Sequence, residues 1–96
     1  MLSLDGCGYL QKVIYLQNNY IFMKNKNLVN IEFGKRISHL RNKYGLSQEV
    51  LADKCNLNRT YIGAIERGEK SPTIITISKI AKGFNLTLKD IFDYEK

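Results

Sequence analysis

The sequence predicts an all-α fold of five short helices that follows a short N-terminal appendage. From Ile31 onward, apolar residues recur at the three- and four-residue spacing of amphipathic helices. Between successive apolar stretches stand residues that start or end helices. A chain of 96 residues is large enough for one core, so we expect an appendage over residues 1–30 and one helical domain over residues 31–96.

The appendage lacks a regular period. Its stretch KVIYLQNNYIFMK has apolar and aromatic runs on both sides of an Asn-rich turn, which suits a hairpin, although a helix suits it nearly as well. Met23 is followed by KNKNLVN and would also serve as the start of a shorter protein. The structure of residues 1–30 and the choice between Met1 and Met23 as the start therefore stay open.

The first two predicted helices are separated by Gly45, which suits a left-handed helix stop. The inner face of the first helix carries Phe33, Ile37, Leu40, Arg41 and Tyr44, and off this face lie Lys35, Arg36 and Lys43. Ser47 is a suitable N-cap for the second helix, and Glu49 favours its dipole. The inner face of the second helix is formed by Leu51, Ala52 and Cys55.

The third predicted helix follows a tight turn, Asn56–Leu57–Asn58. Asn56 can adopt the left-handed conformation that ends one helix, and Asn58 can cap the next, which runs to about Arg67 and stops at Gly68. Two short helices joined in this way match a helix-turn-helix unit, whose second helix enters the major groove of DNA.

The fourth and fifth predicted helices complete the domain. Thr73 can cap the fourth helix and Asn85 can end it, while Thr87 and Asp90 resemble a capping box that opens the fifth. Their predicted inner residues are Ile74, Ile77, Ile80, Ala81 and Phe84 in the fourth helix, and Leu88, Ile91 and Phe92 in the fifth.

The stretch LSQEVLADKCNLNRTYIGAIERGEKSPTIITISKIAKGFNLTLKDIF resembles the Cro/repressor (XRE-type) helix-turn-helix family, and the resemblance covers Ile31 to about Tyr94. Within that family, NLNRTYIGAIERG is most similar to the controller proteins of restriction-modification systems. The resemblance implies a Cro/repressor-like domain that acts as a homodimer and binds palindromic operators in double-stranded DNA. An antitoxin that regulates its own operon and a phage-type repressor remain alternatives.

The predicted base contacts lie on the third helix, where residues 59, 60, 63, 64 and 67 share the outer face. Arginine can bind guanine through two hydrogen bonds, and threonine or alanine can touch a thymine methyl group. The predicted contacts are Arg59, Thr60, Tyr61, Gly63 and Ala64. Gly63 either lets the helix backbone approach the groove closely or is incidental at an exposed site.

The predicted phosphate contacts surround this helix. The resemblance places Gln48 where the family grips a phosphate at the positive end of a helix. The full predicted set is Gln48, Arg67, Lys70, Ser71, Arg36 and Lys43. The chain carries 15 Lys and Arg against 9 Asp and Glu, a net charge of +6, and this balance favours a polyanionic partner.

Two further predictions concern contacts between protein groups. Arg41 and Glu66 stand on otherwise apolar faces and match paired family positions, so we expect a partly buried ion pair between them. The dimer interface is expected on the fifth helix and the turn before it, through Asn85, Leu86, Leu88, Ile91, Phe92 and Tyr94. The alternative for Leu88, Ile91 and Phe92 is that they serve the protomer core instead. If the protein activates transcription, Glu49 and Asp53 are expected to contact RNA polymerase.

Other classes of function find no support in the sequence. It has no Gly-rich phosphate loop, metal-ligand cluster or nucleophile beside a histidine, so no enzyme, cofactor, metal or small-molecule substrate is expected. His39 is predicted at the surface, and Cys55 as a small core residue. No apolar run reaches the ~18 residues that cross a bilayer, so we expect no membrane partner and a cytoplasmic location.

Overall fold

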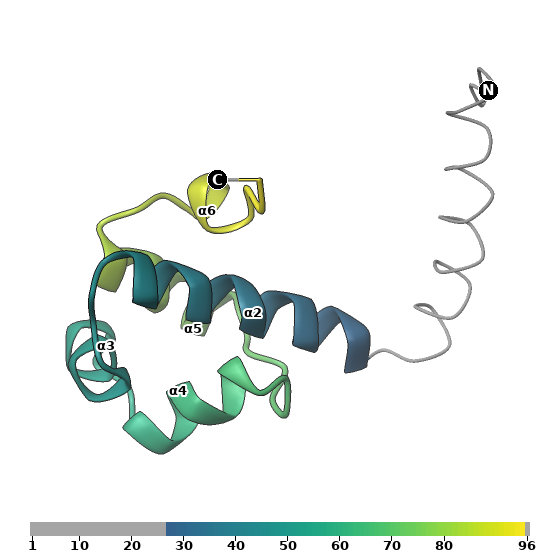
Figure 1. Cartoon of the computed structure of the whole chain (residues 1–96), viewed down its shortest axis with the longest axis horizontal. Coiled ribbons are helices and arrows are strands. Elements are labelled where there is room, and N and C mark those ends of the chain that lie inside the picture. Colours follow the sequence, from purple (N-terminus) through teal and green to yellow (C-terminus); the bar gives the residue numbers. More distant parts are fainter. Residues whose placement is uncertain (1–26, 96) are drawn as a thin grey trace, which may run out of the picture.

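The computed structural model describes residues 27–95, which form helices and connecting turns without a strand (Figure 1). The helices are α2 (Asn27–Lys43), α3 (Gln48–Cys55), α4 (Arg59–Glu66), α5 (Ile74–Phe84) and α6 (Leu88–Ile91). The predicted all-α fold of five helices is confirmed. The hairpin or helix considered for residues 12–24 lies outside the described residues.

Helix α2 begins earlier than the sequence predicted. It starts at Asn27 rather than Ile31, so residues 27–30 are helical. The first turns of α2 pack closely on the end of α4. A Cβ atom at Gly68 would lie 2.6 Å from Ile31 Cγ1, and Gly68 has a φ of +78°. This contact seats the start of the apolar period of α2 against the turn that follows α4.

The predicted helix caps are all present. Ser47 Oγ accepts a hydrogen bond from the Val50 N–H at 3.1 Å, and Asn58 Oδ1 accepts one from the Thr60 N–H at 2.7 Å. Thr73 caps α5, and Thr87 and Asp90 form the capping box of α6. The left-handed helix ends are also present, at Asn56, Asn85, Gly45 and Gly68.

One hydrophobic core receives side chains from each of these helices. Its members are Phe33, Ile37, Leu40, Leu51, Ala52, Cys55, Ile62, Ile65, Ile77, Ile80, Ala81, Phe84 and Ile91. Burial raises the pKa of the Cys55 thiol to about 11, so it stays protonated at neutral pH, as expected for a core residue.

Some residues predicted to face the core do not. Ile74 is 66% exposed, because it opens α5 and the first turn of that helix projects beyond the core. Leu88 and Phe92 remain 39% and 47% exposed, since the short α6 turns only Ile91 fully inward. Tyr44 is also partly exposed, although its ring packs against Phe84 with centroids 5.8 Å apart.

Helices α2 and α4 cross with their backbones almost in contact. A Cβ atom at Gly34 would overlap the carbonyl oxygen of Ile65 and would lie 2.7 Å from that of Glu66. Only a glycine allows this approach. The sequence did not single out Gly34, because the contact depends on the crossing point of two helices.

Arg36 is buried, so the prediction that it contacts a DNA phosphate is wrong. Its side chain crosses from α2 to the end of α6, where Nε donates to the Ile91 carbonyl at 2.9 Å and Nη2 to the Asp90 carbonyl at 2.7 Å. These carbonyls lie at the end of α6, and the Asp90 carbonyl also accepts a hydrogen bond from the Asp93 N–H at 3.2 Å. Within residues 27–95, Nη1 of Arg36 has no hydrogen-bond partner.

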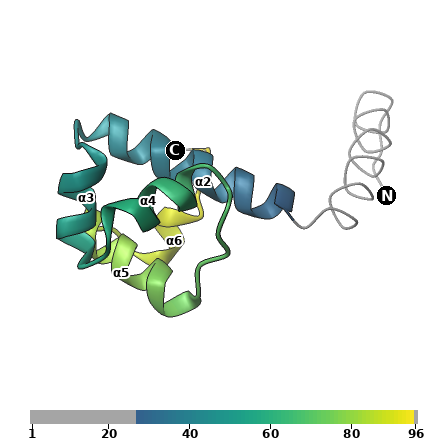
Figure 2. The same cartoon turned by 90° about the horizontal axis from the view of Figure 1, so that it is seen from below.

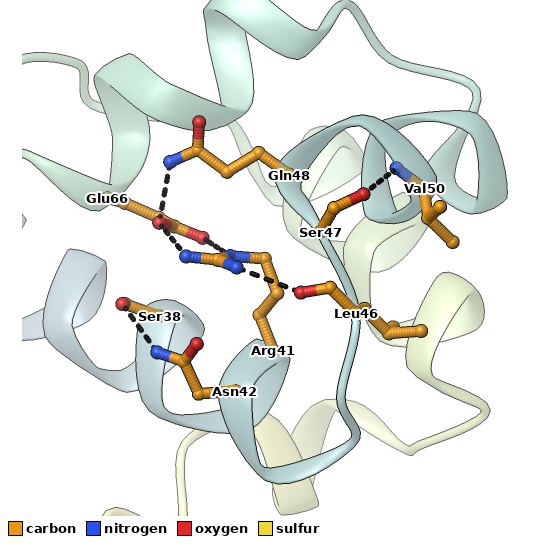
Figure 3. Close-up of polar contacts among 8 residues, drawn as sticks. All are labelled: Ser38, Arg41, Asn42, Leu46, Ser47, Gln48, Val50 and Glu66. Atoms are coloured by element: carbon orange, nitrogen blue, oxygen red, sulfur yellow. Dashed lines mark hydrogen bonds and ion pairs between the residues drawn. The ribbon is translucent and has the colours of Figure 1, made fainter.

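Arg41 and Glu66 form the ion pair that the sequence predicted, and it joins α2 to α4 (Figure 3). Arg41 Nε donates to Glu66 Oε2 at 2.7 Å, and Nη2 donates to Oε1 at 3.1 Å. Arg41 Nη1 also donates to the Leu46 carbonyl at 2.9 Å. The side chains are 15% and 7% exposed, so the pair is largely shielded from water.

Replacing Glu66 with Gln should destabilise the domain, because Arg41 keeps its buried charge without a counter-charge. We expect a loss of about 2–3 kcal/mol, below the ~3–5 kcal/mol of a fully buried pair. Thermal unfolding should show this as a melting temperature lower by roughly 10 °C or more. Glu69→Gln is the matched control, because it removes a solvent-exposed ion pair with Arg67. Equal melting temperatures for both variants would contradict the prediction.

Replacing Arg36 with Met should also lower stability, because the carbonyls of Ile91 and Asp90 lose their hydrogen bonds from Arg36. A loss of about 1–3 kcal/mol is expected, with faster amide hydrogen exchange in α6. Lys35→Met is the control, because Lys35 is the exposed neighbour on the same helix. If both variants melted at the wild-type temperature, Arg36 would not hold α6 in place.

Candidate DNA-binding surface

Helices α3 and α4 form a helix-turn-helix unit with a tight, internally bonded turn. Asn56 has a φ of +57°, and the Leu57 N–H donates to the Ala52 carbonyl at 2.8 Å. Leu57 is half-buried and packs against the core. Figure 2, seen from below, places α4 in front of the other helices. The turn therefore fixes where α4 begins relative to α3.

The first turn of α4 presents two polar side chains beside the ring of Tyr61, which packs against the core. Arg59 and Thr60 are exposed, whereas Tyr61 is half-buried and packs against the core. The Tyr61 ring is thereby held in place, and two flexible polar side chains stand next to it at the start of the helix. The N-terminal residues of recognition helices are those that reach base edges.

Two of the predicted base contacts are not on the surface. Ala64 is 6% exposed, and the chain turns back beside it so that the Glu69 N–H donates to the Ala64 carbonyl at 2.9 Å. Gly63 is also buried, because the ends of Gln48 and Arg67 lie over it. The prediction that both lie open on the outer face is wrong, since side chains and a loop cover them.

Gln48 is the first residue of α3 and reaches toward α4. Its Nε2 donates to Glu66 Oε1 at 2.9 Å, so the same carboxylate accepts hydrogen bonds from Arg41 and from Gln48 (Figure 3). The backbone N–H of Gln48 lies in the first turn of α3, where the helix provides no acceptor for it. Sequence reasoning did not connect Gln48 to Glu66.

The loop after α4 is exposed and carries several polar residues. Lys70 and Ser71 are exposed, and Arg67 forms an ion pair with Glu69. Arg67 Nε donates to Glu69 Oε2 at 2.9 Å, and Nη2 donates to Oε1 at 3.2 Å. This hydrogen bonding lowers the pKa of the Glu69 carboxyl. Sequence reasoning missed Glu69, whose only signal was its place two residues after an arginine.

Lys43 lies on another side of the domain. It lines a shallow depression with Leu86 and Asp90, next to α6, whereas Arg41 on the same helix contacts α4. This position does not support a phosphate contact from Lys43. His39 is exposed on α2, as the sequence predicted.

The predicted dimer surface on α6 is partly apolar and partly used by the core. Leu88, Phe92 and Tyr94 are exposed, but Ile91 is fully buried and belongs to the protomer core, the alternative that the sequence left open for it. Leu86 is half-buried against the core, and Asn85 is the exposed C-cap of α5. Burial, and then the nearby Glu32 carboxylate, raises the pKa of Tyr94.

The described residues offer no site for a metal ion, since they contain no group of three or more His, Cys, Asp or Glu side chains able to hold one. In the same part of the chain, no helix is both long and apolar enough to span a bilayer.

Comparison with known sequences identifies the family. Residues 37–91 match the helix-turn-helix model HTH_3. The control protein C.BamHI of Bacillus amyloliquefaciens is 39% identical over 69 residues, which cover 71% of this chain and 85% of that protein. The control protein C.MunI of a Mycoplasma species is 39% identical over 72 residues, which cover 73% of this chain and 97% of that protein.

Solved structures give the same result. The restriction-modification controller C.AhdI from Aeromonas hydrophila has a TM-score of 0.66 and 35% identity, covering 68% of this chain and 98% of that one. The C.Esp1396I controller tetramer, in complex with its natural 35 base-pair operator, has a TM-score of 0.64 and 36% identity, covering 67% and 84%. The chain therefore belongs to the helix-turn-helix family of transcriptional regulators, and within it to the restriction-modification controller proteins.

Proposed function

We propose that the protein controls a restriction-modification operon by binding operator DNA as a homodimer, without catalysing a reaction. The observation that carries the proposal is the first turn of α4, where Arg59 and Thr60 project beside the anchored Tyr61. None of the relatives named above is described as an antitoxin or a phage repressor. A regulator of bacterial operons acts on DNA in the cytoplasm, which agrees with the location expected from the sequence.

Base recognition is proposed for Arg59, Thr60 and Tyr61. Solved structures similar to this chain include C.Esp1396I variants in which an arginine, the next residue threonine and the next residue tyrosine are each replaced. The same three residue types follow one another here at 59 to 61. Arg59 is the candidate for a bidentate guanine contact.

Binding to the phosphates of the DNA backbone is proposed for Gln48, Arg67, Lys70 and Ser71. Gln48 combines a backbone N–H in the first turn of α3, for which the helix itself provides no acceptor, with a side chain held close to α4. The other three lie in the exposed loop that leaves α4 (Figure 2). Contacts of this kind fix the position of the protein on the duplex without reading sequence.

Dimerisation is proposed through α6 and the turn before it. Leu88, Phe92 and Tyr94 are apolar or aromatic and exposed on one short segment at the end of the domain. A second copy would bury them, with Leu86 and Asn85 at the edge. A two-fold dimer places two recognition helices on a palindromic operator.

Activation of transcription is proposed to involve RNA polymerase and the acidic side chains of α3. Glu49 and Asp53 are both exposed on this helix, one turn apart, and are free to meet a second protein beside the DNA. Glu49 also favours the helix dipole, so Asp53 is the more informative position for a polymerase contact.

Selection of bound sites from random duplex DNA should return a two-fold symmetric consensus. On that duplex, Arg59→Ala should cost about 1–3 kcal/mol and relax the preference at one base per half-site. Lys70→Ala should weaken cognate and scrambled duplexes alike, and should lower the slope of log K against log salt by about one unit per contact. Binding titrations at several salt concentrations measure both effects.

The charge control for these variants is Lys43→Ala, because Lys43 lies beside α6 rather than α4. It should leave the salt slope nearly unchanged. If Arg59→Ala weakened both duplexes equally, the protein would still bind DNA, but Arg59 would not read its sequence. If no consensus emerged from the selection, the proposed function would be wrong.

The dimer should be visible by sedimentation at micromolar concentration. Leu88→Ser should raise its dissociation constant by about tenfold, because a buried apolar side chain contributes on the order of 1.5 kcal/mol or more. Ile75→Ser is the matched control, since Ile75 is an exposed isoleucine on α5, outside the proposed interface. If Ile75→Ser dissociated the dimer and Leu88→Ser did not, the interface would lie at the first turn of α5.

A further inference from the structure

Gly63 lies in the middle of α4, where a glycine is unfavourable, and the structure shows what occupies the space of its missing side chain. A Cβ atom there would lie 3.2 Å from Arg67 Nη1 and 3.4 Å from Gln48 Oε1. At Gly34, in contrast, a Cβ atom would meet backbone atoms of α4. Gly34 is therefore needed for helix packing, whereas Gly63 makes room for the ends of two polar side chains.

Each of these two side chains is also hydrogen-bonded to a glutamate. Gln48 is tied through Nε2 to Glu66, which leaves its Oε1 over Gly63. Arg67 is tied through Nε and Nη2 to Glu69, which leaves its Nη1 over Gly63. The Arg67 side chain reaches back over the preceding turn, the usual direction for a long side chain of a helix. The two groups therefore meet over the same residue, one turn from Arg59.

We propose that Gly63 is a positioning residue for DNA binding. Because it has no side chain, it leaves space in which the Arg67 guanidinium can lie beside Gln48. This inference rests on the proposed function. An alanine methyl group would press against Nη1 at 3.2 Å, and the flexible arginine would give way. Arg67 would then leave the position from which its Nη1 donates to a phosphate oxygen. Gln48 would move less, since 3.4 Å is an ordinary contact and Glu66 holds its amide.

The competing explanation is that Gly63 lets the helix backbone itself approach the DNA. In that case a methyl group would collide with the duplex, whatever residue stood at position 67. The two explanations differ in whether the effect of Gly63→Ala depends on Arg67. A double-mutant cycle measures this dependence directly.

The experiment compares the wild type, Gly63→Ala, Arg67→Ala and the double variant on the selected operator duplex, by fluorescence anisotropy. Gly63→Ala should melt no lower than the wild type, because alanine is the better helix former. It should nevertheless bind about 5- to 10-fold more weakly, as expected for losing a charge-assisted hydrogen bond. In the Arg67→Ala background, the same change should alter affinity by less than about twofold. Lys43→Ala again controls for the loss of one charge.

Equal weakening by Gly63→Ala in both backgrounds would overturn the inference in favour of close backbone approach. Unchanged affinity of Gly63→Ala in the wild-type background would overturn it as well. Failure of the wild type to select an operator would instead reject the proposed function, and this outcome is seen before any variant is compared.

Discussion

The carboxylate of Glu66 is the contact on which the rest of the binding surface depends. It accepts hydrogen bonds from Arg41 on α2 and from Gln48 on α3, while itself belonging to α4. One largely buried charge therefore joins three helices whose faces must stay in register. Its position is possible only because Gly34 lets α2 and α4 approach to backbone contact. The Glu66 carboxylate thus both joins the helices inside the domain and holds Gln48 at its outer surface.

The outer surface follows from this arrangement. Because Glu66 holds the side chain of Gln48, the start of α3 stands in a fixed relation to α4, although the two helices are joined only by a short turn. Gln48 belongs to this network and lies over Gly63, next to the end of Arg67. A protein of this size can therefore present a preorganised surface to DNA without a large core beneath it.

The parts of the fold that depend only on residues close together in the sequence could be predicted from it. Helix caps such as Ser47 and left-handed stops such as Asn56 are local chemistry, and the structure contains them where the pattern predicts them. Arg36 and Ala64 were misplaced, because their burial depends on segments distant in sequence or on a loop that turns back. Helical spacing alone cannot tell which of several outward positions another element will cover. The pair between Arg41 and Glu66 was predicted on two grounds, because both residues stand on otherwise apolar helix faces and match paired family positions.

Helix α2 has one more consequence for how the protein fits its operator. Arg36 bonds it to the end of α6, and Arg41, five residues later, bonds it to Glu66 on α4. In the view of Figure 1, α2 lies between α6 and α4. The proposed dimer surface and α4 are therefore both bonded to the same helix. One inserted base pair rotates a half-site by about 36° and moves it by about 3.4 Å. Because one helix carries bonds to both surfaces, we expect the proposed dimer to discriminate the spacing between half-sites as well as their bases.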